Sequence, residues 1–315
     1  MLRRKFSGCK ELIFLKCRTQ RLFSMLIASV IASFLARTSQ HYFRKTKNKK
    51  LSALAPSWQN PLLRMNNDFY YKAIEPDESL LDFVENIGMF HNKSDKDMEV
   101  VLMPDGRIDL FFMQTESEPF QIALIGLENV PEQQVIRANT WAFKISFKPL
   151  GAEYILQTSI ADILNSAKVL PQDFWDIING DLKDFEDFHT QIAQKLKELL
   201  PDKIDERKRQ LFKLVYESNG EIKIQELSEK ISWSSREINR YFNKQFGLSL
   251  NAFCKILRFK ASLEHIAKGR LFPELNFTDQ THFIKEIKKF SGVVPSELLK
   301  NKDDRFILLS VLKEQ

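Results

Sequence analysis

Cysteine is scarce in this chain, and its few copies are poorly placed for chemistry. The three cysteines, Cys9, Cys17 and Cys254, are too few for a disulfide framework and lack the spacing of metal ligands. The histidines are scattered, and none pairs with acids or cysteines at metal-binding spacing. We therefore predict no metal site, no cofactor and no catalytic residue. With no sign of an oxidising compartment, the expected location is the cytoplasm.

Acidic residues are nearly absent from residues 1–64, which hold fourteen Lys or Arg and one acid, a net charge of +13. Residues 65–204 hold twelve basic and twenty-five acidic residues, a net charge of −13, and residues 205–302 hold nineteen and twelve, a net charge of +7. An acidic middle beside a basic C-terminal segment is typical of a sensor joined to a nucleic-acid-binding module. Chance clustering of charge is the alternative interpretation.

A long apolar run is also missing. The segment Leu22–Ala36 has about fifteen apolar residues, fewer than the roughly twenty that a membrane-spanning helix needs. The basic residues 3–5 and the small residues near Ala36 would also suit a signal peptide. We favour a third interpretation, a disordered or non-native leader over residues 1–64, because its composition is foreign to the rest and Met65 resembles a natural start. Membrane association through Leu22–Ala36 is the alternative.

Short strands separated by turns are predicted between Glu99 and Lys148. Pro104-Asp105-Gly106 is a turn signal, because proline pre-sets φ and Asp-Gly permits positive φ. The four predicted strands, the last of which alternates with the period of a half-buried strand, are Val100–Met103, Asp109–Met113, Phe120–Ile125 and Thr140–Phe147. Asp105 and Asp109 could be paired catalytic carboxylates. A capped turn and an acid on an edge strand explain them more simply.

Apolar residues at helical spacing follow in residues 185–199, namely Phe185, Phe188, Ile192, Leu196 and Leu199. This stripe could join two copies of the chain through Phe188, Ile192 and Leu196. The alternative, which we favour slightly, is a helix packed on its own domain. Pro201-Asp202-Lys203 ends the helix and marks a linker.

The segment after the linker contains helices and no strand signal. Helices are predicted over residues 205–217, closed by Asn219-Gly220, over 224–231, and from Ser235 to Gly247. Ser234 and Glu237 fit a capping box. Ile238, Phe242 and Phe246 form the buried face of the last helix, and its opposite face carries Arg236, Asn239, Arg240, Asn243 and Lys244. Arg and Asn match base edges, whereas Lys and Ser bind phosphates. A solvated polar face is the alternative.

A repeat favours the DNA-binding interpretation. Forty-five residues downstream, Asp279–Gly292 has the same plan, with Gly292 in the place of Gly247 and Lys285 in the place of Arg240. Between the two units, Leu250, Phe253, Leu257 and Ala261 predict one long connecting helix. Two helices held in this way could enter successive major grooves.

These residues resemble the AraC/XylS family of transcription regulators. The matching segments, whose order, spacing and glycines agree, are Leu227–Gly247, Phe277–Phe283 and Gly292–Glu297. The resemblance implies that Arg236, Asn239 and Arg240 face bases in the first unit, and Thr281, His282 and Lys285 in the second. The full set of candidate DNA-binding residues is Ser235, Arg236, Asn239, Arg240, Asn243, Lys244, Gln280, Thr281, His282, Lys285 and Lys289.

Two features of the second unit depart from this pattern or compete with it. The helix that should precede its base-reading helix is shortened to Leu271–Asn276, where Pro273 allows only about one turn. The second unit is therefore expected to dock less firmly or to grip phosphates only. A lone histidine such as His282 is also more often a surface or capping residue than a base reader. Most sequence specificity is expected from Arg236, Asn239 and Arg240.

Residues 65–201 look like an uncharacterised sensor-type domain found in some of these regulators. The predicted fold is α+β: a leader over 1–64, a β-rich domain with a helical C-terminal part over 65–201, an all-α domain of two helix-turn-helix units joined by a long helix over 205–302, and a tail over 303–315. The expected protein is a sequence-specific transcription regulator of double-stranded DNA. RNA polymerase, an unidentified small-molecule effector and a second copy of the chain are further candidate partners.

Two other functions compete with a cytoplasmic regulator. One is a membrane-anchored regulator that uses Leu22–Ala36. The other is an enzyme tethered to DNA, as in fused repair proteins. That class needs a reactive cysteine in its catalytic domain, and residues 65–253 contain no cysteine.

Overall fold

The structure of the chain is a computed structural model that describes residues 63–64, 68–115, 119–177, 184–274 and 277–313. The chain divides into two compact units, Met1–Ser57 with Glu116–Pro119, and Trp58–Thr115 with Phe120–Gln315. Almost all of the first unit lies outside the described residues, as do residues 1–62 of the predicted leader with the apolar segment Leu22–Ala36. The last two leader residues form β1 (Leu63–Arg64), which pairs with β2 (Phe69–Ile74), so the predicted boundary at Met65 is wrong for them. Everything below concerns the second unit. None of the helices described between Leu63 and Lys313 has the length and apolar composition of a membrane span.

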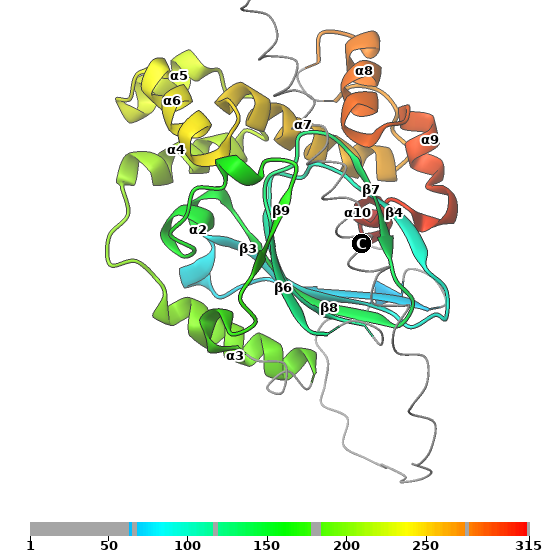
Figure 1. The fold of residues 1–315 in the computed structure, drawn as a ribbon. Helices are drawn as coiled ribbons and strands as arrows, with labels where there is room; N and C mark the ends of the chain where they lie inside the picture. The colour runs from blue at the N-terminus through cyan, green and yellow to red at the C-terminus, as the bar shows by residue number, and fades with distance from the viewer. Residues whose placement is uncertain (1–62, 65–67, 116–118, 178–183, 275–276, 314–315) are drawn as a thin grey trace, which may run out of the picture. The chain divides into compact units, whose positions relative to one another are not determined.

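The N-terminal half is β-rich and the C-terminal half is helical, so the predicted α+β class is confirmed (Figure 1). The described strands are β1 (Leu63–Arg64), β2 (Phe69–Ile74), β3 (Val84–Asn92), β4 (Met98–Leu102), β5 (Ile108–Gln114), β6 (Gln121–Ile125), β7 (Glu132–Ile136), β8 (Thr140–Phe147) and β9 (Ala167–Leu170). The described α-helices are α2 (Pro149–Tyr154), α3 (Phe185–Glu198), α4 (Glu206–Glu217), α5 (Ile224–Ile231), α6 (Ser235–Phe246), α7 (Leu250–Ala267), α8 (Gln280–Ser291), α9 (Pro295–Lys300) and α10 (Ile307–Lys313).

Seven of the described strands form one sheet in the order β1-β2-β3-β8-β5-β6-β9, and β4 pairs with β7. Every pair is antiparallel. The turn at Pro104–Gly106 exists, and its glycine has φ 79°. It connects two strands that belong to different sheets. Asp109 was predicted on an edge strand, which is wrong: β5 lies between β8 and β6, because both of its edges carry hydrogen-bonded partners.

One face of the sheet is apolar and is covered by α3. Directly paired residues on this face are fully buried, among them Ile145 and its partner Leu110. The Phe188 ring of α3 lies 4.8 Å from that of Phe143 and 5.3 Å from that of Phe112. Phe188, Ile192 and Leu196 are each 0 % exposed. The stripe predicted on this helix therefore packs on its own sheet, and the hypothesis that it joins two copies is wrong.

The helices of the C-terminal half begin and end where local sequence signals place them. Ser234 and Glu237 form the predicted capping box: the Ser234 Oγ accepts from the Glu237 N–H at 3.3 Å, and Glu237 Oε2 accepts from the Ser234 N–H at 3.1 Å. Gly247 and Gly292 end α6 and α8 in the left-handed region, with φ 74° and 80°. α7 runs between these two helices (Figure 1). Residues Leu271–Glu274, where a shortened helix was expected, have no helical turn in the part that the structure describes.

Two apolar clusters hold the described chain together. The larger includes the sheet core and α3, and continues through the inner faces of α4, α5, α6 and the first half of α7. The smaller contains the second half of α7, α8, α9 and α10, and it includes Met103 from the β-rich half. Residues 303–315, set apart above as a tail, contain α10, whose Leu309 is fully buried in this second cluster. Cys254 is 4 % exposed in the larger cluster, as predicted for a core side chain, and burial raises its pKa to about 11.

Candidate nucleic-acid interface

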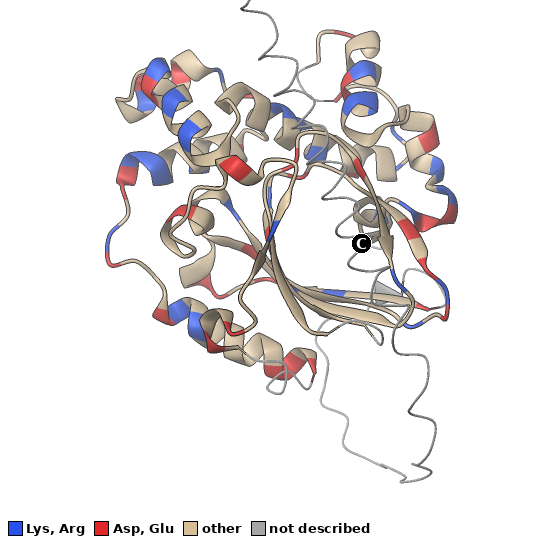
Figure 2. Cartoon of the chain, in the orientation of Figure 1, with Lys and Arg blue, Asp and Glu red and all other residues tan. Residues whose placement is uncertain are grey.

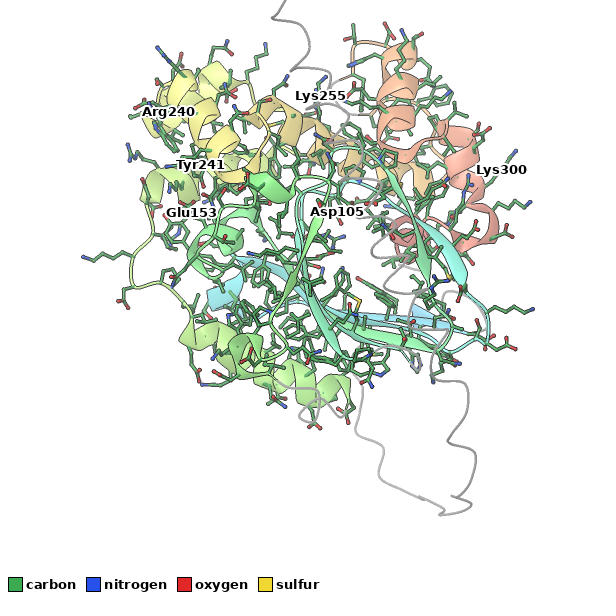
Figure 3. All side chains as sticks on the ribbon, viewed as in Figure 1. Asp105, Glu153, Arg240, Tyr241, Lys255 and Lys300 are labelled. Carbon is green, nitrogen blue, oxygen red and sulfur yellow. The ribbon has the colours of Figure 1, made fainter. Side chains whose placement is uncertain are left out.

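α6 has a buried face and a polar face, and the division follows its sequence period. Ile238, Phe242 and Phe246 are all 0 % exposed, and the Phe212 ring of α4 packs 5.6 Å from that of Phe242. The opposite face exposes side chains that the sequence predicted, namely Arg236, Arg240, Asn243 and Lys244. Arg240 lies at the outer side of the helix in Figure 3. The face can thus offer two guanidinium groups and one ammonium group to a partner.

The two asparagines of this face are engaged with their own helix. Asn239 is half-buried, and its Nδ2 donates to the Ser235 carbonyl at 3.1 Å. Asn243 Nδ2 donates to the Asn239 carbonyl at 2.8 Å. Each of these bonds uses one of the two amide hydrogens, so the amide is restrained while its Oδ1 and its second N–H remain free of that bond. The arginines of α6 are more exposed than Asn239, which lies on the same face.

α8 repeats the plan of α6 and, like it, exposes three basic side chains. The two helices have twelve residues each and are offset by forty-five positions. Blue segments recur along both in Figure 2. The side chains of Thr281, Lys285 and Lys289 are exposed, as is that of Lys288, which is not among the residues predicted above. Lys288 takes the repeat position of Asn243, so the alignment of the repeats could have identified it.

Gln280 and His282 serve the local structure of the second unit. Gln280 is half-buried, and its Nε2 donates to the Leu271 carbonyl at 2.9 Å. His282 Nδ1 accepts from the Thr278 N–H at 3.3 Å, and its ring lies 5.7 Å from that of Phe277. Asp279, the N-cap of α8, accepts from the His282 N–H at 2.8 Å. These bonds support the capping role that competed with base contact for His282.

α6 is also in contact with the β-rich half of the chain. Glu153, on α2, accepts a hydrogen bond from the Tyr241 hydroxyl at 2.6 Å and forms an ion pair with Lys208 of α4. Figure 3 shows Tyr241 beside Glu153. Burial, with the nearby Glu153 carboxylate, raises the pKa of Tyr241, so the phenol keeps its proton as a donor. Neither residue is among those predicted above, because no local pattern links positions eighty-eight residues apart.

Charged residues also gather around the turn at Asp105. Asp105 accepts from the Arg107 N–H at 3.0 Å and forms an ion pair with its guanidinium. This pairing outweighs the effect of burial and lowers the pKa of Asp105 to about 2. Lys144 pairs with Asp109 at 3.5 Å. These acids have salt-bridge partners, as structural carboxylates do, and the turn-capping interpretation of Asp105 is confirmed.

A row of polar side chains crosses three neighbouring strands on the face opposite α3. Ser146 pairs in register with Asn86 on one side and with Asp109 on the other, so the three side chains project from the same face. Asn86 Oδ1, Ser146 Oγ and Asp109 Oδ1 are buried and make no hydrogen bond in the described structure. Across the described residues, no group of three or more His, Cys, Asp or Glu side chains is placed to hold a metal ion.

A family model described as a domain of unknown function, DUF6597, matches residues 72–168, a segment within the β-rich half. Among curated proteins, none matches this chain. Several solved structures of ToxT from Vibrio cholerae are similar. One from strain O395 shares 12% identity over 65% of this chain and 96% of that chain, with a TM-score of 0.36. A P21 form shares 12% identity over 74% and 98%, with a TM-score of 0.37.

Proposed function

We propose that this protein is a sequence-specific, DNA-binding transcription regulator of the AraC/XylS type. In this proposal α5 with α6 forms the first helix-turn-helix unit and α8 carries the second base-reading helix. The observation that carries it is the exposed polar face of α6 over a fully buried apolar face, repeated on α8. An exposed helix face rich in Arg and Lys suits the major groove, where guanidinium groups pair with guanine and ammonium groups neutralise phosphates.

The two helices take different parts in this proposal. α6 reads sequence, chiefly through Arg236 and Arg240, whose side chains are exposed. α8 contributes attraction to phosphates through Lys285, Lys288 and Lys289. This division is supported by the local bonds of Gln280 and His282, which hold these side chains to their own unit.

The test uses the full chain and Arg240→Ala. Duplexes selected by the protein from a random pool and unselected duplexes are compared by fluorescence anisotropy at several salt concentrations. We expect selective binding that weakens with salt, and Arg240→Ala should lose about 1–3 kcal/mol on the selected duplex and little on unselected ones. Lys213→Ala, a change at an exposed lysine of α4, is the control. Equal binding of selected and unselected duplexes by the wild-type chain would contradict the proposal.

Regulation by a small molecule is the second part of the proposal, and the β-rich half is its expected site. Its support is the row Asn86, Ser146 and Asp109, whose buried oxygens can accept hydrogen bonds from a ligand. A compound that binds there should change the duplex affinity measured in the same assay and should lose this effect in Ser146→Ala. A compound that acts equally on the variant does not bind at this row.

A further inference from the structure

α6 is held by a short segment that lies outside the helical half of the chain. This segment consists of Glu153 on α2 and residues Thr158–Ala161 that follow it, and we call it the holding segment. It contacts α6 at two places, in the middle of the helix and at its last turn. Neither contact uses the side chain of Arg236 or Arg240.

The middle contact fixes the rotation of α6. Tyr241 follows Arg240 in sequence, and its hydroxyl donates to Glu153 Oε2 at 2.6 Å. The other carboxylate oxygen pairs with Lys208, whose Nζ lies 4.8 Å from the centre of the Tyr241 ring. A rotation of α6 about its axis would break this arrangement. The same rotation would move Arg240, because adjacent residues on a helix turn together.

The second contact supplies hydrogen-bond donors to the carbonyl groups at the C-terminal end of α6. The last carbonyls of a helix have no partner within it and need donors from elsewhere. Ser159 Oγ donates to the Lys244 carbonyl at 2.9 Å, and the Ile160 N–H donates to the Gln245 carbonyl at 2.9 Å. In return, Gln245 Nε2 donates to the Thr158 carbonyl at 2.6 Å. These bonds fix the position of the helix end along its axis.

The equivalent end of α8 is packed differently. A Cβ added to Gly247 would lie 2.8 Å from the Ala161 carbonyl oxygen, so this backbone approaches the holding segment closely. A Cβ added to Gly292 would meet Pro131 Cγ at 3.9 Å, an ordinary contact. The C-terminal end of α6 therefore approaches the β-rich half more closely than the C-terminal end of α8 does.

We propose that Glu153 and Tyr241 are positioning residues for base recognition: through them the β-rich half sets the orientation in which α6 meets DNA. This inference rests on the proposed DNA-binding function of α6. Bidentate contacts to a base tolerate only small errors in distance and angle, whereas attraction to phosphates tolerates larger ones. Loosening the holding segment therefore lowers discrimination between sequences more than it lowers overall affinity. Through the same contact, a conformational change in the β-rich half would act directly on the orientation of α6.

The experiment measures discrimination, defined as the ratio of affinities for a selected and an unselected duplex, in the full chain. The variants are Tyr241→Phe, which keeps the ring, Glu153→Gln, and both together. Each single variant should lower discrimination by about 5-fold or more, with the affinity for the unselected duplex unchanged. The double variant should be no worse than the stronger single variant, because both act through one contact. Glu217→Gln, which removes a surface pair with Lys213 on α4, is the control.

The outcomes separate this inference from the proposed function. If the wild-type chain does not discriminate, the DNA-binding proposal fails. If it discriminates and the variants retain the wild-type ratio, the positioning role is overturned and the DNA-binding proposal stands. A parallel fall in both affinities also overturns it, since a general loss of structure acts in that way. Melting curves of each variant at the assay temperature establish that the folded chain is being compared.

Discussion

Glu128 is a carboxyl group that the fold makes sensitive to pH near neutrality. Burial, together with the nearby acids Asp105, Glu132 and Asp109, raises its pKa to about 8. The folded state thus holds a proton that the unfolded chain releases at an ordinary glutamate pKa, near 4.5. Asp105 behaves in the opposite sense, because its ion pair with Arg107 lowers its pKa to about 2.

These pKa changes predict how stability depends on pH. The contribution of Glu128 is fully present below about pH 4.5 and is lost as pH rises toward 8, by up to about 1.4 kcal/mol per pH unit. That of Asp105 is present above about pH 3.8 and is lost only as pH falls toward 2. Glu128→Gln should therefore flatten the fall in unfolding free energy between pH 5 and pH 8, measured by urea denaturation. An unchanged pH profile in the variant would mean that Glu128 ionises normally in the folded chain.

At the scale of single residues, the sequence identified the exposed arginines of the polar face but not the local bonds of the asparagines beside them. Arg236 and Arg240 are exposed as helical periodicity requires. Asn239 lies on the same face, yet its amide donates to the carbonyl of Ser235. Helical periodicity gives the direction of a side chain and says nothing of whether it bonds to its own backbone. Short polar side chains make such local bonds readily, whereas long arginines reach past them.

At the scale of the helix, Gly247 and Gly292 occupy equivalent C-cap positions of α6 and α8. They end α6 and α8 in the left-handed region, so alanine should cost each about 1–2 kcal/mol from backbone strain alone. At Gly247 the added Cβ would also lie 2.8 Å from the Ala161 carbonyl oxygen. Gly247→Ala should therefore destabilise the chain by at least about 1 kcal/mol more than Gly292→Ala does, as measured by urea denaturation. Equal losses of unfolding free energy in the two variants would show that the holding segment moves to accommodate the added methyl group.

Elements of the helical half follow from local signals more directly than those of the β-rich half. Ser234 and Asp279 cap the first turns of α6 and α8, and two glycines cap their last turns. Each capping residue is adjacent in sequence to the helix that it caps. Strands were predicted where β4, β5, β6 and β8 lie, but β1, β2, β3, β7 and β9 were missed. β7, for example, is polar and mostly accessible, and it is a strand because it pairs with β4. A strand completed by its partner has no strong signal of its own.

At the scale of the whole molecule, the apolar core crosses from the sheet into the first helical unit. Ile192 is fully buried in this core on α3. Ile192→Ala should lower the unfolding free energy by about 2–5 kcal/mol, independently of protein concentration, since the stripe is buried within one chain. Hydrogen exchange should become faster in α6 as well as in the sheet, because one core supports both.

The control for this prediction is Gln194→Ala on the exposed side of α3, expected to change stability by no more than about 0.5 kcal/mol. A destabilisation by Ile192→Ala that disappears as protein concentration rises would instead restore the stripe as an interface between two copies. Faster exchange confined to the sheet would show that α6 is supported independently of the β-rich half.

The sequence by itself determined the features that depend on neighbours along the chain: the caps and buried faces of α6 and α8, their offset, and the exposed arginines. Periodicity and capping act over one or two turns, so the residues that matter are all within reach of a local pattern. The tertiary structure decided the order of the strands, the packing of α3 on its own sheet, and the contact between Glu153 and Tyr241. These contacts join residues far apart in the chain, and they exist only because the larger core brings the two halves together.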